Sequence, residues 1–231
     1  MDIKPDTSAR MRRFIEGAEL IHSNAAALYD EAQILGQTGA FARAAVLHQI
    51  SMEECSKVET LGAVVVSILG GKEVDEASLT KKFRDHKAKN YANAYNAEPT
   101  GEERSARENH DWEAAHAAFK KFQSDFHKNK NAIKNAGLYV DYVDGAFVAP
   151  VDTVTEATAF ACMQLNADFL RLGEDFIRLL GRIGAEPGRY ARVFGAFLSN
   201  TQAMQLMDGL GAEAVIEAIV EQMRSQIEAS R

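Results

Sequence analysis

Apolar residues recur at three- and four-residue steps over long stretches of this chain, the pattern of helices with one buried face. The clearest example runs from Gly39 to Glu59. Polar caps and glycines divide the first part of the chain into two long helices, expected at about 7–36 and 40–69. A short glycine turn joins them, which predicts an antiparallel helical hairpin.

The same periodicity predicts a third helix over about 75–96 and a fourth over about 108–136, with a polar connection at 99–107 between them. Trp112 is expected to face inward on the fourth helix. Its lysines are expected mostly on the outer face: Lys120, Lys121, Lys128, Lys130 and Lys134. These four helices suffice for an antiparallel bundle.

Near 138–150 the pattern changes to alternating apolar and polar residues around Asp144-Gly145, which predicts a short extended arm or hairpin. The remaining helices are expected at about 155–184, 190–207 and 213–228. The sequence therefore predicts an all-α fold. A helical bundle with its arm would occupy residues 7–150, and additional C-terminal helices over 151–231 would pack on it.

Composition narrows the class of protein. Only four prolines occur in 231 residues, in keeping with a helical fold, and two distant cysteines argue against a disulfide framework or a cysteine-built zinc site. The start has no apolar leader, and the longest apolar run, 61–71, is too short for a bilayer, so we expect a cytoplasmic protein without a membrane partner. A net charge of −7 argues against a bulk nucleic-acid binder, although residues 72–136 are net basic and could present a local RNA-binding face.

Three charged residues, Glu53, Glu54 and Lys57, lie inside the apolar pattern of the second helix. Both acids have the spacing of a helical ion pair with Lys57, which offers the simple interpretation of a surface salt bridge. Charges in such apolar surroundings are costly to desolvate unless they are partnered. We therefore favour a buried polar cluster that bridges helices.

The third helix carries a basic run that includes Arg84, Lys87 and Lys89 around His86. Histidine ordinarily titrates near neutral pH, so His86 could serve as a general acid or base beside cations that bind phosphate. A solvated basic face explains the same run equally well. The local sequence leaves both interpretations open.

Two further patterns could carry chemistry. Arg43 and His48 have four residues between them, a spacing used by a class of metal-independent ribonucleases, but on one helix their side chains would point about 140° apart. Two Glu-x-x-His matches, Glu19 with His22 and Glu113 with His116, are reminiscent of di-iron carboxylate bundles. Such short matches are frequent by chance, and no cofactor is otherwise indicated.

Three stretches of the chain occur in a characteristic order. The first, GAELIHSNAAALYDEAQILGQTGAFARAAVLHQISMEECSK, combines a small-residue helix, a glycine turn, an Arg-Ala step and Glu-Glu-x-x-Lys. The second is the Phe-x-x-His-x-x-Lys arrangement of Phe83, His86 and Lys89, and the third is KNAGLYVDYVDGAFVAP. Together they resemble the AbiV-type abortive infection family of the HEPN superfamily.

This resemblance implies an all-α HEPN bundle, often dimeric, that acts in bacterial antiphage defence by interfering with translation. Many HEPN relatives are metal-independent ribonucleases that pair an Arg and a His across a dimer interface. Their motif lies late in the bundle with a polar residue after the Arg, whereas Arg43 lies early in the second helix and precedes Ala44.

The leading hypothesis is therefore a defence protein that acts on RNA as a metal-independent ribonuclease, with no cofactor. The expected catalytic set is His86 with Glu53, Glu54 and Lys57, and the expected phosphate contacts are Lys87, Lys89, Arg84, Arg43 and His48. The alternative is a non-enzymatic helical module that binds a phage or host protein or forms a homodimer. A di-iron carboxylate enzyme is the third interpretation.

Overall fold

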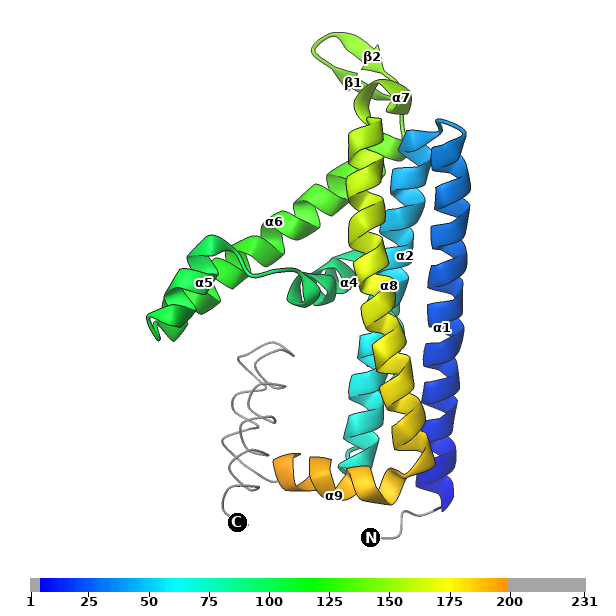
Figure 1. Cartoon of the computed structure of the whole chain (residues 1–231), viewed down its shortest axis with the longest axis vertical. Coiled ribbons are helices and arrows are strands. Elements are labelled where there is room, and N and C mark those ends of the chain that lie inside the picture. The colour runs from blue at the N-terminus through cyan, green and yellow to red at the C-terminus, as the bar shows by residue number, and fades with distance from the viewer. Residues whose placement is uncertain (1–4, 199–231) are drawn as a thin grey trace.

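The computed structural model of the protein describes residues 5–198. Three long helices lie side by side in it (Figure 1): α1 (Pro5–Gln37), α2 (Phe41–Leu69) and α8 (Glu156–Ala185). The turn between α1 and α2 places Gly39 at a φ of 79°, a left-handed conformation that favours glycine. The predicted antiparallel hairpin is confirmed, and α8 packs against both of its helices.

The core lies between these three helices. Its main cluster combines the apolar stripes of α1, α2 and α8: Met11, Phe14, Ile15, Ala18, Val58, Leu61, Val65, Ile68, Leu180 and Ile183. A second cluster farther along the bundle contains Ala25, Met52, Cys55 and Phe169. The apolar stripes predicted for α1 and α2 therefore form the core.

The prediction of a single helix over 75–96 is wrong, because the helix is interrupted at Asp85. The structure has α3 (Glu76–Arg84), then α4 (His86–Asn93) and a short 3-10 turn, η1 (Ala94–Asn96). Asp85 adopts an extended backbone and its carboxylate accepts hydrogen bonds from the backbone N–H groups of Lys87 and Ala88, at 2.9 and 3.1 Å. This N-cap starts a new helix.

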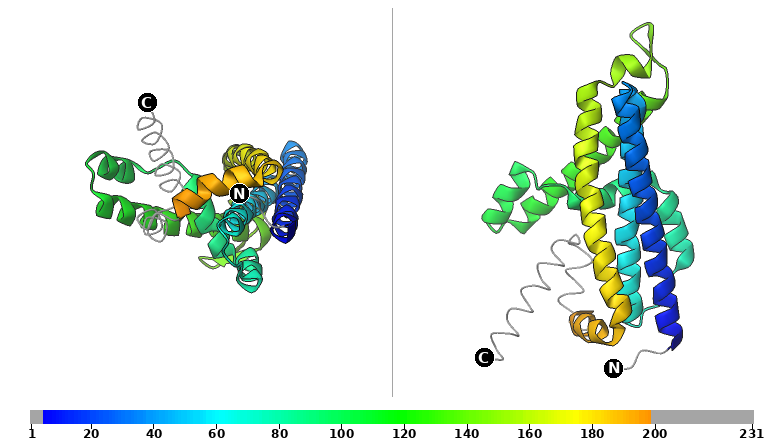
Figure 2. Two further views of the ribbon diagram at one scale, coloured as in Figure 1. Left: turned by 90° about the horizontal axis from the view of Figure 1, so that it is seen from below. Right: turned by 45° about the vertical axis from the view of Figure 1, so that its right-hand side comes forward.

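The segment after η1 also departs from expectation. The connection predicted at 99–107 is mostly helical, because Thr100 caps α5 (Gly101–Glu108). The next helix, α6 (Trp112–Leu138), runs obliquely away from the three long helices, so that α5 and the first half of α6 project from the bundle (Figures 1 and 2). Trp112 is 58% exposed rather than inward-facing, since it lies at that projecting end.

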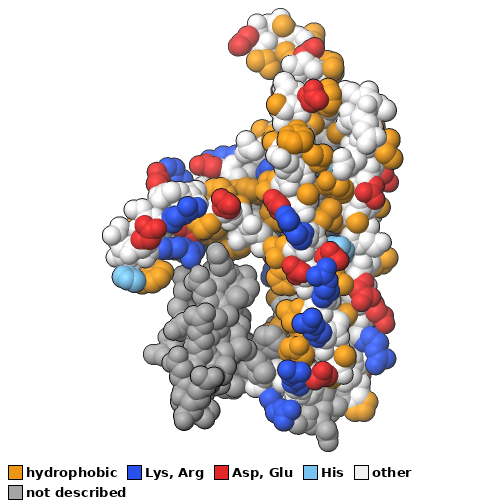
Figure 3. All heavy atoms as spheres, in the orientation of Figure 1, with side chains coloured by type: hydrophobic (Ala, Val, Ile, Leu, Met, Phe, Trp, Pro, Cys, Tyr) orange, Lys and Arg blue, Asp and Glu red, His pale blue; other side chains and the backbone are white. Residues whose placement is uncertain are grey.

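The predicted arm is confirmed as a hairpin of β1 (Asp141–Val143) and β2 (Ala146–Val148), with Tyr142 opposite Phe147. Asp144 and Gly145 form its turn at φ values of 51° and 85°. The hairpin and the short α7 (Pro150–Thr153) stand at one end of the bundle, and Figure 3 shows apolar side chains on the surface of this arm.

At the opposite end, α9 (Pro187–Leu198) crosses the bundle and contacts α2 and α8 (Figure 1). The helix predicted at 190–207 thus begins three residues early, while its end and the helix predicted at 213–228 lie outside the described residues. The all-α fold is confirmed, and a domain boundary at 150 stays a prediction. Within residues 5–198, no helix combines the length and apolar content needed to cross a membrane.

Candidate functional site

The most concentrated polar contact in the described residues centres on the carboxylate of Glu53, on α2. Glu53 is 1% exposed. Its Oε2 lies 2.5 Å from Nδ1 of His86 and 2.7 Å from the ammonium of Lys89, both on α4, while its Oε1 lies 3.2 Å from the ammonium of Lys134 on α6. We call these four residues the Glu53 cluster. It joins three helices around one buried charge.

Two local features of the sequence bring α4 and α6 to Glu53. The cap at Asp85 makes His86 the first residue of α4, and Lys89 follows one turn later on the same face. On α6, a Cβ atom at Gly137 would lie only 2.6 Å from the side chain of Val46 and 2.8 Å from a backbone oxygen of α2. The absence of a side chain there lets α6 approach α2 closely, which places Lys134 within reach of the carboxylate.

Electrostatics keep the Glu53 carboxylate charged. Burial raises its pKa, but hydrogen bonds from Lys89 and His86 and the charges of Lys89 and Lys134 together outweigh burial, so the net effect is a lowered pKa. An ionised carboxylate at Oε2 accepts the Nδ1–H of His86 and thereby orients the ring. In the neutral form of this ring, the other nitrogen, Nε2, carries the lone pair.

His86 combines this buried anchor with an accessible ring, because its side chain is 59% exposed. Lys87 and Arg84 are exposed beside it, and the ammonium of Lys87 lies 5.1 Å from the ring centre of Tyr91. The geometry is thus that of a histidine held by a carboxylate at a surface that exposes Arg84 and Lys87 as well as Asp85, which is suited to acid–base chemistry.

Glu54 and Lys57 do not join the Glu53 cluster. They form an ion pair with each other, Glu54 also accepts a hydrogen bond from Asn24 of α1, and the Lys57 ammonium lies 5.5 Å from the Phe83 ring centre. Successive residues on a helix point about 100° apart, which is why Glu53 reaches α4 while its neighbour turns toward α1.

Arg43 and His48 also have separate partners. Arg43 donates to the backbone oxygens of Gly137 and Leu138, at 2.9 and 3.1 Å, at the end of α6. His48 is 2% exposed, its Nδ1 lies 3.2 Å from Nδ2 of Asn166, and burial lowers its pKa to about 4. The ribonuclease-like spacing therefore does not bring these two side chains to one site within the chain.

The Glu-x-x-His pairs give no metal site in the described residues. His22 Nε2 lies 3.0 Å from the backbone oxygen of Leu170 on α8, whereas His116 is exposed on the projecting part of α6. No group of three or more His, Cys, Asp or Glu side chains converges anywhere in residues 5–198. The di-iron interpretation lacks a ligand set in that part of the chain.

Sequence reasoning missed the placement of Lys134 and His127 at this site. Lys134 was expected on the outer face, yet only 13% of its side chain is exposed, and Lys130 is likewise buried. His127 lies seven residues, or two helical turns, before Lys134 and so shares its face of α6. That spacing was the available signal, but it has meaning only once α6 is known to pack on α2 by its C-terminal half.

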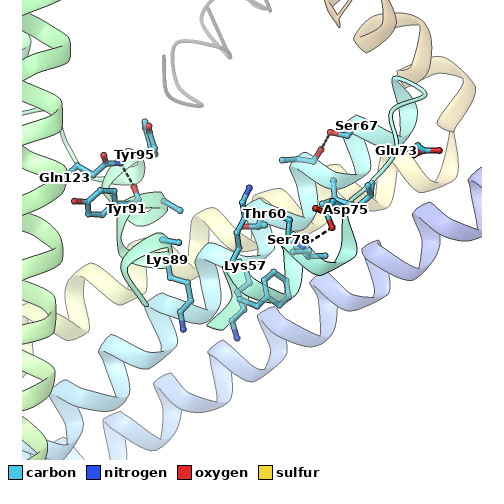
Figure 4. A pocket seen from close by; sticks show the side chains of 18 of the residues that line it. Lys57, Thr60, Ser67, Glu73, Asp75, Ser78, Lys89, Tyr91, Tyr95 and Gln123 are labelled. Carbon is cyan, nitrogen blue, oxygen red and sulfur yellow. Dashed lines mark hydrogen bonds between the residues drawn. The ribbon is translucent and has the colours of Figure 1, made fainter. Parts of the chain in front are cut away.

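A groove of about 650 Å³ opens beside the cluster, between α2, α3, α4 and α6. Figure 4 shows Tyr91, Tyr95 and Gln123 on one side, with Gln123 donating to the Tyr91 backbone oxygen at 3.0 Å. Lys89 contributes to the wall of this groove while its ammonium binds Glu53. The cluster thus adjoins a hollow surface lined in part by half-buried aromatic rings.

Comparison with known proteins agrees with this architecture. The family model described as AbiV (HEPN_AbiV) matches residues 13–171, which is more than half of the chain and includes all four residues of the Glu53 cluster. A relative from Sinorhizobium fredii (strain NBRC 101917 / NGR234), "Uncharacterized protein y4gJ", is 33% identical over 116 residues, covering 50% of this chain and 60% of the relative. The chain thus spans less than two thirds of that relative's length. No solved structure matches significantly. The extent of the family match shows that the chain belongs to the AbiV family of HEPN proteins.

Proposed function

We propose that this protein acts in abortive-infection-type antiphage defence by cleaving RNA without a metal ion, and so interferes with translation. The observation that carries the proposal is the contact between Glu53 and His86, in which a buried, ionised carboxylate orients an exposed imidazole at 2.5 Å. Family membership supports the defence role. The action on RNA rests on the site.

The site supplies the groups that cleavage by the RNA's own 2′-hydroxyl requires. Nε2 of His86 takes the hydroxyl proton as the O2′–P bond forms and the P–O5′ bond breaks, and the departing 5′ oxygen takes up a proton from solvent. The products are a 2′,3′-cyclic phosphate and a 5′-hydroxyl end. Lys87 and Arg84, exposed beside His86, bind the phosphate charge, while Lys89 and Lys134 hold Glu53 ionised.

The direct test compares purified wild-type protein with His86→Ala on single-stranded RNA, with analysis of the product ends. His116→Ala is the matched control, since His116 is exposed on α6 away from the cluster. We expect cyclic phosphate ends from wild type and control, and loss of at least about 100-fold in rate for His86→Ala. Undiminished cleavage by His86→Ala, or its full protection of cells against phage, would contradict the proposal.

One observation favours a second candidate, a module that binds a phage or host protein or a second copy of the chain. The arm and the adjoining α7 expose large apolar side chains, with Tyr142, Phe147 and Val151 exposed at 62%, 80% and 77%. For this candidate, Phe147→Ser would abolish phage protection without altering the thermal midpoint, and His86→Ala would leave protection intact. Sedimentation of the wild type and Phe147→Ser would distinguish self-association from a different partner.

A further inference from the structure

A second histidine, His127, lies against the Glu53 cluster without belonging to it. It shares its face of α6 with Lys134, and its Nδ1 lies 3.3 Å from Nδ2 of Asn90, which is one residue after Lys89 on α4. The Tyr91 ring meets it edge-on, with ring centres 5.8 Å apart. A hydrogen bond and an edge-on ring contact thus hold this ring where α4 meets α6.

A buried amide chain sets which ring nitrogen of His127 carries the proton. Gln49 on α2 donates from Nε2 to Oδ1 of Asn90 at 3.1 Å, and both residues are 1% exposed. Because the Asn90 oxygen is thereby engaged, its NH₂ group faces the imidazole, and Nδ1 of His127 is the acceptor. The proton of the neutral ring then sits on Nε2.

Burial and two nearby cations keep that ring neutral. Burial and the positive charges of Lys87 and Lys134 lower the pKa of His127, and the opposing charges of Asp85 and Glu53 do not compensate. The two histidines therefore differ in kind. His86 offers a lone pair at Nε2, because its Nδ1–H donates to Glu53, whereas His127 offers an N–H at the same ring position.

We propose that His127 binds a phosphoryl oxygen of the RNA through its Nε2–H, as a neutral hydrogen-bond donor beside the proton acceptor His86. This inference rests on the proposed ribonuclease function and adds a substrate-binding residue to it. A neutral donor stabilises the charge that grows on the phosphoryl oxygens during attack and gives up no proton. Asn90, whose oxygen accepts a hydrogen bond from Gln49, holds the Nδ1 side of the ring.

Two substitutions separate a hydrogen-bond donor from a proton donor. The amide nitrogen of His127→Gln occupies the position of Nε2 and preserves the donor, whereas His127→Asn keeps only the position of Nδ1. We expect His127→Gln to retain the wild-type kcat within a few-fold and His127→Asn to lose about 100-fold, with equal thermal midpoints. Equal loss in both variants would overturn the inference, since it would indicate a proton-transferring ring.

A measurement without turnover keeps this inference distinct from the proposed function. In ¹⁵N NMR spectra of the full chain at pH 7, we expect the Nε2–H tautomer for His127 and a shift of that signal on addition of a 2′-O-methyl RNA oligonucleotide, which cannot be cleaved. If wild type cleaves no RNA, the proposed function fails, and the spectra still decide the inference. An Nδ1–H tautomer, or an Nε2 signal unmoved at saturation, would refute it.

Discussion

Adjacent glutamates on α2 offer a sharp test of the electrostatic argument. Glu53→Gln removes the charge that two ammonium groups share, those of Lys89 and Lys134, whose side chains are only 10% and 13% exposed. Removing one partner from a buried ion pair leaves uncompensated charge and costs about 3 to 5 kcal/mol. The retained amide oxygen still accepts hydrogen bonds, so we expect about 3 kcal/mol.

Glu54→Gln is the matched control one residue away. It breaks a single pair with Lys57, in which the side chains are 15% and 17% exposed and three residues apart on one helix. Because only one ammonium group, that of Lys57, loses its counter-charge, we expect a smaller loss of unfolding free energy than for Glu53→Gln. Urea unfolding followed by circular dichroism should therefore show a midpoint lowered more for Glu53→Gln, with similar slopes for both variants.

The pH dependence of the same pair of variants provides a second check. The pKa of Glu53 is lowered below its ordinary value of 4.5, so its stabilising contribution is present above that pH and is lost as pH falls through the folded-state pKa. The difference in unfolding free energy between wild type and Glu53→Gln should thus shrink as pH falls below 4.5. If Glu54→Gln lowered the free energy of unfolding as much as Glu53→Gln does, the Glu53 cluster would not be the dominant buried charge contact that we infer.

Three further predictions concern stability and binding. Burial raises the pKa of Glu59 to about 7, so the folded state disfavours the charged form. As pH rises from 4.5 through 7, the free energy of unfolding of the wild type, measured with urea, should therefore fall by about 3 kcal/mol relative to that of Glu59→Gln. Gly137→Ala should lower the free energy of unfolding by about 2 kcal/mol or more in the same assay, because the new Cβ clashes with α2. The control is Gly181→Ala, at an exposed helical position where a Cβ meets no other atom, and it should leave stability unchanged or slightly raised. Lys87→Ala should weaken RNA binding and reduce the dependence of log Kd on log salt by about one unit in fluorescence anisotropy, because Lys87 would contact one phosphate.

The helical fold was largely predictable from the sequence because its signals are local. Apolar steps of three and four residues and glycine turns gave α1, α2 and α8 to within a few residues. The break at Asp85 was also encoded locally, as an aspartate that caps α4, but it was hidden within a run of good helix formers. The helix propensity of the residues on both sides of Asp85 favours one continuous helix, and a single capping residue is a weak signal against it.

The site was less predictable because it depends on contacts between distant segments. His86 and Glu53 were both candidates, and the structure brings them together across 33 positions. Lys134 lies a further 48 residues along and was assigned to the outer face, since a lysine in an amphipathic helix is normally solvated. Only the close approach of α6 to α2 at Gly137 turns that side chain into the bundle.

An acidic protein can still act on RNA if its positive charge is local. The chain carries a net charge of −7, yet the Glu53 cluster sets two lysines against one carboxylate, and Lys87 and Arg84 are exposed beside it. Because the Debye length at physiological salt is about 8 Å, a phosphate at His86 experiences this neighbourhood far more strongly than the distant acidic residues. Burial, together with the charges of Lys87 and Lys134, disfavours protonation of His127. One of the cations expected to attract a phosphate, Lys87, therefore also helps to keep the donor ring neutral.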